Sequence, residues 1–119
     1  MEFIIHKNNN NMIAEIAGDE IIINNLQDAL DMIANISYNE INRIIIKEKN
    51  IVPDFFKLST GLAGDVLQKC VNYNIKMAIV GSFENHKSKS LNAFIIECNR
   101  GKQFFFVSNT EKAKEMLDK

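Results

Sequence analysis

The stretch RIIIKEKNIVPDFFKLSTGLAGDVLQKCVNYNIKMAIVG, residues 43–81, decides the fold because it predicts a strand, a helix and a strand in succession. Residues 43–47 form a continuous apolar run between two charges, which is typical of a central strand covered on both faces. Residues 76–81 form a second such strand, which closes on a glycine. A helix that connects two such strands makes them parallel neighbours. The stretch therefore predicts an α/β domain.

Between these two strands we expect a loop followed by a helix. Pro53 biases the residue before it toward extended backbone, so residues 48–56 are interpreted as a loop that Phe55 and Phe56 anchor to the core. The helix begins in LSTGLAG, ends near Asn74 and carries one apolar face. That predicted face consists of Ala63, Val66, Leu67, Cys70 and Val71.

The flanking segments extend the pattern in both directions. Apolar runs at residues 2–6 and 12–17 enclose KNNNN, whose asparagines suit a hairpin turn, and a cap at Asn24 or Asn25 begins a helix that runs to about Tyr38. Further elements are expected as a helix containing residues 91–98, a strand at 103–107 and a helix at about 110–117. The predicted fold is a single α/β domain, residues 1–119, with a mixed sheet in the element order β-β-α-β-α-β-α-β-α and only the opening hairpin antiparallel.

Composition fits one ordinary soluble domain. Apolar residues make up 46% of the 119 residues and charged residues 24%, as in typical globular proteins. No apolar run approaches the roughly 20 residues of a membrane helix, and MEFIIHKNNNN lacks the features of a secretory signal. We therefore expect a cytoplasmic protein that is not inserted in a membrane.

Charge and ligand-forming residues exclude several classes of function. The formal net charge is −1 and no two Lys or Arg residues are adjacent, which argues against a nucleic-acid partner. His6 and His86 stand far apart and outside any metal-binding spacing, so no metal and no cofactor is assigned. Cys70 and Cys98 lie in predicted helices and are interpreted as small buried hydrophobes, in keeping with reduced thiols.

A candidate site follows from the topology, because ligands of open α/β sheets bind at the carboxyl ends of the parallel strands. The loops after residues 47 and 80 carry glycines, hydroxyls and a histidine, and a helix N-terminus made accessible by Gly61 and Gly64 suits an anion. The candidate residues for a ligand or a partner are Ser59, Thr60, Gly61, Leu62, Ala63, Gly64, Ser82 and His86.

A simpler interpretation explains the same residues without a ligand. Ser59 or Thr60 can cap the helix, which contributes roughly 1 kcal/mol, and the glycines can allow an unusual turn or close packing of the helix on the sheet. His86 and the lysines around it can be a solvated loop. Two glycines in one opening turn nevertheless cost about 1 kcal/mol each relative to alanine, which indicates that something approaches closely there, whether a ligand or protein.

Sequence motifs do not supply a catalytic set. TGLAGD has neither the spacing of a phosphate-binding loop nor that of a dinucleotide-binding loop, and no G-x-S-x-G nucleophile motif is present. No catalytic residue is therefore assigned.

The strings PDFF (53–56) and TGLAGDVLQK (60–69), taken together with four others, resemble a bacterial family catalogued as domain of unknown function 4180. The resemblance spans nearly the whole chain and is densest from Pro53 to Gly101. That family has no assigned activity, so the resemblance bears on the fold more than on the function. The strings are PDFF (53–56), TGLAGDVLQK (60–69), NY (72–73), AIVG (78–81), SLNAFIIE (90–97) and NRG (99–101).

A wider similarity is to the STAS domain of sulfate transporters and anti-sigma factor antagonists, which has the same order of elements. The bacterial antagonists carry D-S-[ST]-G-L-G at the start of the second helix, and a kinase phosphorylates the first serine of that motif. Residues 59–63 resemble the motif, although Leu58 replaces the aspartate and Ala63 the second glycine. The similarity implies a STAS-like fold and Ser59 as a candidate phosphorylation site.

Two classes of function stay open at this point. One is a non-catalytic regulatory or binding module that uses the turn at residues 59–64 to contact a protein partner or a small anion. The other is an enzyme that acts on a phosphorylated or carboxylated small molecule held at that turn, with His86 as acid or base. The pattern of residues favours the first, and the oligomeric state is not predicted.

Overall fold

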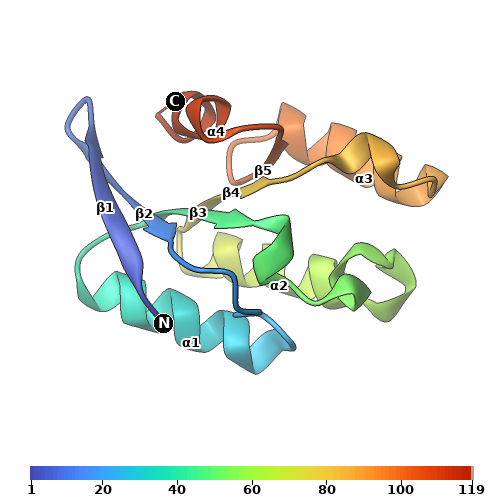
Figure 1. The fold of residues 1–119 in the computed structure, drawn as a ribbon, viewed down its shortest axis with the longest axis horizontal. Coiled ribbons are helices and arrows are strands. Elements are labelled where there is room, and N and C mark those ends of the chain that lie inside the picture. The colour runs from blue at the N-terminus through green and yellow to red at the C-terminus, as the bar shows by residue number, and fades with distance from the viewer. Residues whose placement is uncertain (119) are drawn as a thin grey trace.

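Five strands form one sheet in the computed structural model, in the order β1-β2-β3-β4-β5 (Figure 1). The structure describes residues 1–118 apart from the side chain of Asn85, and Lys119, the predicted end of the domain, lies outside the described residues. The strands are β1 (Phe3–Asn8), β2 (Asn11–Ile16), β3 (Arg43–Lys47), β4 (Lys76–Val80) and β5 (Phe104–Val107).

Four α-helices alternate with the strands, which makes the fold the mixed α/β domain that the sequence predicts. They are α1 (Leu26–Tyr38), α2 (Leu62–Asn72), α3 (Lys89–Arg100) and α4 (Thr110–Leu117). The prediction lacked four short 3-10 helices, so the observed order of elements differs from the predicted one where they occur. These are η1 (Glu48–Asn50), η2 (Pro53–Phe56), η3 (Leu58–Thr60) and η4 (Phe83–Asn85).

Strand directions follow from the lengths of the connections. The turn between β1 and β2 places Asn9 and Asn10 at φ 49° and 75°, a left-handed backbone that asparagine tolerates, and these two strands are antiparallel. The pairs β2–β3, β3–β4 and β4–β5 are parallel, since each connection contains a helix. β3 is the central strand, as predicted.

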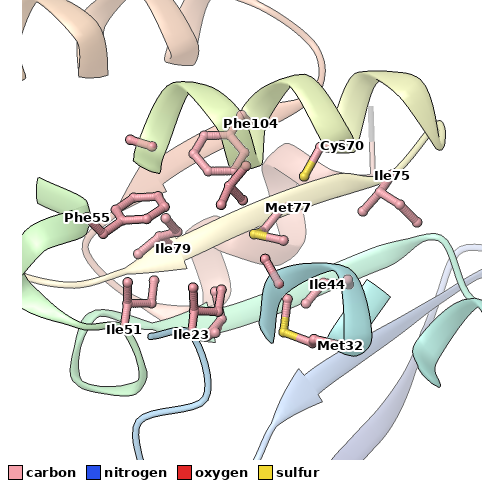
Figure 2. Packing of buried hydrophobic residues seen from close by; sticks show 14 of the residues in the cluster. Ile23, Met32, Ile44, Ile51, Phe55, Cys70, Ile75, Met77, Ile79 and Phe104 are labelled. Carbon is pink, nitrogen blue, oxygen red and sulfur yellow. The ribbon is translucent and has the colours of Figure 1, made fainter. Parts of the chain in front are cut away.

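In Figure 1, α1 and α2 lie on one side of the sheet and α4 lies on the other. On one face the main core packs against α1 and α2, and Figure 2 shows Phe55 pointing into this core close to Ile79. On the other face a smaller cluster packs beneath α4. Successive side chains of β2, β3, β4 and β5 point to opposite faces of the sheet, so these strands contribute residues to both clusters.

The end of α2 differs from the prediction. The helix ends at Asn72 because Asn74 takes a left-handed φ of 55° and the N–H of Ile75 donates to the carbonyl of Cys70 at 2.8 Å. Val71 was expected in the buried face, but its side chain is 51% exposed. One residue along a helix is a rotation of about 100°, so Val71, next to buried Cys70, turns toward solvent.

Strand β5 lies at an edge of the sheet, yet its phenylalanines are buried. The side chain of Asn99 in α3 forms two hydrogen bonds to this edge: Nδ2 donates to the carbonyl of Phe106 at 3.1 Å, and Oδ1 accepts from its N–H at 2.8 Å. The amide thus takes the place of a neighbouring strand at Phe106, which protects an edge that would otherwise pair with another chain.

Candidate functional site

The ends of β3 and β4 lie side by side, because Lys47 and Val80 are partners in the parallel register. Glu48 follows β3 directly, and its carboxylate reaches the loop after β4 through both oxygens. Oε1 accepts a hydrogen bond from the N–H of Ser82 at 3.1 Å, and Oε2 lies 2.7 Å from Nε2 of His86. Glu48 therefore holds together the two loops that the topology brings to this carboxyl edge of the sheet.

Gly81 allows this close approach. A Cβ atom at this position would lie 2.4 Å from Oε1 and 2.7 Å from Cβ of Glu48. Both distances are far inside van der Waals contact, and the Cβ of Glu48 is fixed to its backbone. The glycine that closes the predicted strand is thus required by the position of Glu48.

Two aromatic rings contact the imidazole of His86, in addition to the contact of Nε2 with Glu48. Its ring stacks on Phe56, with centroids 5.3 Å apart and planes at 25°, and lies 6.2 Å from Phe83 at 23°. The side chains of His86 and Glu48 are 29% and 30% exposed. His86 is therefore a partly buried, paired residue and not the solvated loop residue of the simpler interpretation.

A cleft of about 560 Å³ opens beside the Glu48–His86 pair. Its volume falls within the range of small-molecule sites. Four of its lining residues are apolar, namely Ile21, Ile51, Pro53 and Phe56, and three are cationic, namely Lys49, Lys57 and Lys87. Glu48, His86 and Ser88 complete the lining. The cleft combines an apolar floor with a cationic rim.

The three lysines of the cleft differ in how they are neutralised. Lys49 forms an ion pair with Asp19, and its hydrogen bond and charge lower the pKa of that carboxyl. Lys57 lies 3.9 Å from Asp54, and both side chains are largely exposed, so solvent screens this pair. In the part of the chain that the structure describes, Lys87 has no acidic partner within 4.0 Å. An anion in the cleft would meet at least one unneutralised ammonium group.

Asn50, whose side chain is fully buried, fixes the floor of the cleft. Its Nδ2 donates to the carbonyls of Gly18 at 3.1 Å and Glu20 at 2.8 Å, and its Oδ1 accepts from the N–H of Lys47 at 3.2 Å. This one side chain thus ties residues 18–20 to residues 47–50. The segment that carries Ile21 is thereby held against η1.

The turn at residues 59–64 corrects the capping interpretation. Neither Ser59 nor Thr60 is the N-cap of α2; both lie in η3, and Gly61 occupies the cap position with φ 81°. The hydroxyl of Thr60 lies 2.9 Å from the carbonyls of Asp54 and Lys57 and accepts from the N–H of Leu62 at 3.3 Å. Thr60 thus fastens η2 to η3 and to the start of α2, and Gly61 supplies the left-handed residue between them.

Close packing on the sheet does not explain Gly64. A Cβ atom added there would meet nothing within 4 Å, and the residue is exposed. Ala63 is buried and Leu62 is half-buried, whereas Ser59 and Gly61 face solvent. The turn therefore offers an open surface and no internal reason for its second glycine.

The predicted site residues separate into two groups. Ser82 and His86 meet at Glu48, and His86 lines the cleft. Residues 59–64 follow Lys57 of the cleft in the chain, but none of them is among its described lining residues. Sequence reasoning missed Glu48, Lys49 and the floor, although Glu48 follows a predicted strand directly and the rule for ligands of α/β sheets applies to that position.

Other titratable groups lie apart from this edge. Glu15 of β2 contacts His6 at 2.6 Å and Lys47 at 3.2 Å; burial raises its pKa, but the hydrogen bonds and charges of these partners outweigh burial and lower the pKa below 4.5. Burial raises the pKa of Cys70 to about 12 and that of Cys98 to about 11, so neither thiol is an activated nucleophile. Within residues 1–118, no group of three or more His, Cys, Asp or Glu side chains is placed to hold a metal ion, and no helix has the length and hydropathy to cross a membrane.

Fold and site together define a single α/β domain with a mixed five-stranded sheet and a cleft at the carboxyl ends of its strands. The chain belongs to the family described as domain of unknown function (DUF4180), whose model matches residues 8–117. No curated protein matches the chain, and no solved structure does.

Proposed function

We propose that this protein is a non-catalytic binding module that takes a small organic anion in the cleft at the carboxyl edge. The observation that carries the proposal is the combination of an apolar floor with a rim of three lysines in one cleft of about 560 Å³. A ligand suited to it has a carboxylate or phosphate group and an apolar part. Binding would remove apolar area of both partners from water, and each Å² so removed contributes about 25 cal/mol.

Glu48 does not oppose an anion as strongly as a free carboxylate would. Both of its oxygens are engaged from within the protein, by the N–H of Ser82 and by His86. Among the described residues, Lys87 is the lysine of the cleft that has no acidic partner within 4.0 Å. The ligand's anionic group is therefore expected at Lys87, and its apolar part on Ile51 and Phe56.

We also propose a regulatory role in the cytoplasm, with the turn at residues 59–64 as the surface that a protein partner contacts. The turn is exposed and adjoins the cleft through Lys57, so a ligand in the cleft and a partner on the turn would lie side by side. The STAS-like relationship and phosphorylation of Ser59 belong to this proposal. A phosphate at Ser59 would add a charge of about −1.5 to −2 to the contact surface and weaken an apolar contact there.

The Glu48–His86 pair favours a second candidate function, an enzyme that acts on a phosphorylated or carboxylated small molecule. Glu48 engages Nε2 of His86, and the ring is stacked on Phe56, which are features of an oriented general acid or base. In this case His86→Ala would abolish turnover while the fold persists. In a binding module the same substitution changes affinity by a small factor only.

Calorimetric titration with phenyl phosphate tests the binding proposal. This probe has one aromatic ring and one phosphate, which match the floor and the rim. Lys87→Gln is expected to weaken binding about tenfold, because a hydrogen bond between charged groups contributes about 1.5 kcal/mol. Lys69→Gln is the matched control, since Lys69 lies on α2 away from the cleft, and its affinity should equal that of the unmodified protein. Equal affinities of both variants would contradict the proposal.

A further inference from the structure

A second concentration of positive charge lies at the opposite, amino edge of the sheet. Arg43 begins β3 and Lys76 begins β4, and the two are direct partners in the parallel register. Their side chains share the face that α4 covers, since Ile45 and Ala78, two residues further along each strand, pack in that cluster. Like charges placed opposite each other in a sheet are destabilising unless something compensates them.

Two further cations surround a pocket next to this pair. Arg100 is the last residue of α3 and Lys102 follows it, and both line a pocket of about 370 Å³ together with Lys76. Phe105 of β5 and Met116 of α4 supply apolar walls, and Gly101, which has no side chain, lies between the two cations. Positive groups from β4 and from the end of α3 thus line one cavity with an aromatic wall.

Within the part of the chain that the structure describes, acidic groups compensate Arg43, Arg100 and Lys102 only in part. Arg100 lies 3.4 Å from Glu97, but both side chains are about three-quarters exposed. Among the described residues, no acidic group lies within 4.0 Å of Arg43 or Lys102. Burial, and then the charges of Arg43 and Lys102, lower the pKa of Lys76, which shows that these cations act on one another.

Helix termini account for part of the cluster only. Nε of Arg43 donates to the carbonyl of Leu117 at the end of α4, and Arg100 suits the negative end of the α3 dipole. Lys102 lies beyond that helix, so its position is not explained in this way. Asn99 also lines the pocket, but its side-chain amide is hydrogen-bonded to the backbone of Phe106. The cations are therefore the polar groups that a ligand would meet.

We propose that this pocket is a second anion site, separate from the carboxyl-edge cleft, for a multiply charged phosphorylated small molecule. Several ammonium and guanidinium groups around one cavity match a phosphate or pyrophosphate group, with Arg100 able to donate two parallel hydrogen bonds. Phe105 and Met116 would contact an apolar part of the same molecule. The negative charge of the ligand would be held by the guanidinium group of Arg100 and the ammonium group of Lys102.

An amide NMR titration with inorganic pyrophosphate tests the site, because this probe isolates the multiply charged group. Saturable shifts are expected at residues 100–105, and Lys102→Glu should raise the dissociation constant at least about fivefold. Lys89→Glu is the matched control: it makes the same change of charge at the other end of α3, and it should leave the constant within a factor of two of the unmodified protein, about the limit for a charge outside the site.

Three results would overturn the inference: no saturable shift at residues 100–105, equal weakening by both variants, or shifts confined to residues 86–88 of the carboxyl-edge cleft. Both lysines are exposed, so the variants are expected to fold. The two proposed sites can be tested independently, because different backbone amides report on binding at each of them.

Discussion

Asn50→Ala is expected to destabilise the protein more than Asn72→Ala or Asn99→Ala. The substitution removes three hydrogen bonds of a fully buried side chain, to Gly18, Glu20 and Lys47. Each net hydrogen bond contributes about 1 kcal/mol, and the abandoned backbone groups stay buried. The free energy of unfolding should therefore fall by about 3 kcal/mol, which lowers the melting temperature by about 10 °C in a domain of this size.

Urea unfolding followed by circular dichroism measures this change. The midpoint should fall while the slope stays constant, since the surface exposed on unfolding is the same. Asn72→Ala is the matched control, because Asn72 is exposed and its hydrogen bond to Gln68 lies on the helix surface, so its cost should stay within about 0.5 kcal/mol.

A second variant tests the direction of the bonds at Asn50. Asn50→Asp keeps the acceptor for Lys47 but turns a carboxylate toward the carbonyls of Gly18 and Glu20, so at neutral pH it should cost more than alanine. Protonation should relieve part of this excess as the pH falls. A loss under about 1 kcal/mol in the alanine variant would refute the assignment of Asn50 as the residue that fixes the floor.

Three further predictions concern residues away from the cleft. The pKa of Glu15 lies below 4.5 in the folded protein, so its stabilisation is present above that pH and is lost as the pH falls through the folded value. Glu15→Gln should cost about 1 kcal/mol in urea unfolding at about pH 6, and this cost should shrink as the pH falls below 4.5. Cys70 and Cys98 should react with an aromatic disulfide reagent only as fast as the protein unfolds, and rapid reaction in the native state would contradict their burial. Asn99→Ala should lower the free energy of unfolding by about 1–2 kcal/mol, because the N–H and the carbonyl of Phe106 both lose their partner. The open edge of β5 should then increase concentration-dependent association in sedimentation. Unchanged association would show that this edge needs no protection.

The sequence predicted the strands and helices well where one physical signal dominated. Residues 43–47 and 76–80 are apolar on both faces, which only a buried strand satisfies, and α4 occupies the predicted residues 110–117. Its ends are set by local chemistry, since Asn109 accepts a hydrogen bond from the N–H of Lys112. Such local signals need no knowledge of the rest of the fold.

Residues 48–60 were harder to predict because tertiary contacts decide their structure. Two 3-10 helices, η1 and η2, stand in the expected loop, and a third, η3, stands where the second helix was expected to begin. The hydroxyl of Thr60 lies against the carbonyls of Asp54 and Lys57 and accepts from the N–H of Leu62, but Thr60 is not the N-cap of α2. A hydroxyl before a helix looks the same in sequence in either role. The left-handed Gly61 was the one signal for the observed turn, since a positive φ favours glycine.

The candidate site was predicted in its location and only in part in its residues. The rule that ligands bind at carboxyl ends of parallel strands led to His86 and Ser82, which meet at Glu48. The apolar floor could not be foreseen, because Ile21 is separated from Ile51 in sequence. Both the buried side chain of Asn50 and the backbone bonds of Ile22 and Ile23 to its carbonyl hold the segment of Ile21 at the cleft. A single buried amide leaves no pattern in a sequence.

The most direct test of the central claim, that the carboxyl-edge cleft binds an organic anion, is an amide NMR titration with phenyl phosphate. Saturable shifts are expected at Lys49, Phe56, Lys57 and Lys87, with weaker or no shifts at Ser59 to Gly64. Phosphate alone should bind more weakly at the same amides, since it lacks the apolar part. Absence of saturable shifts at these four residues would contradict the claim and leave the exposed turn as the only contact surface proposed at this edge.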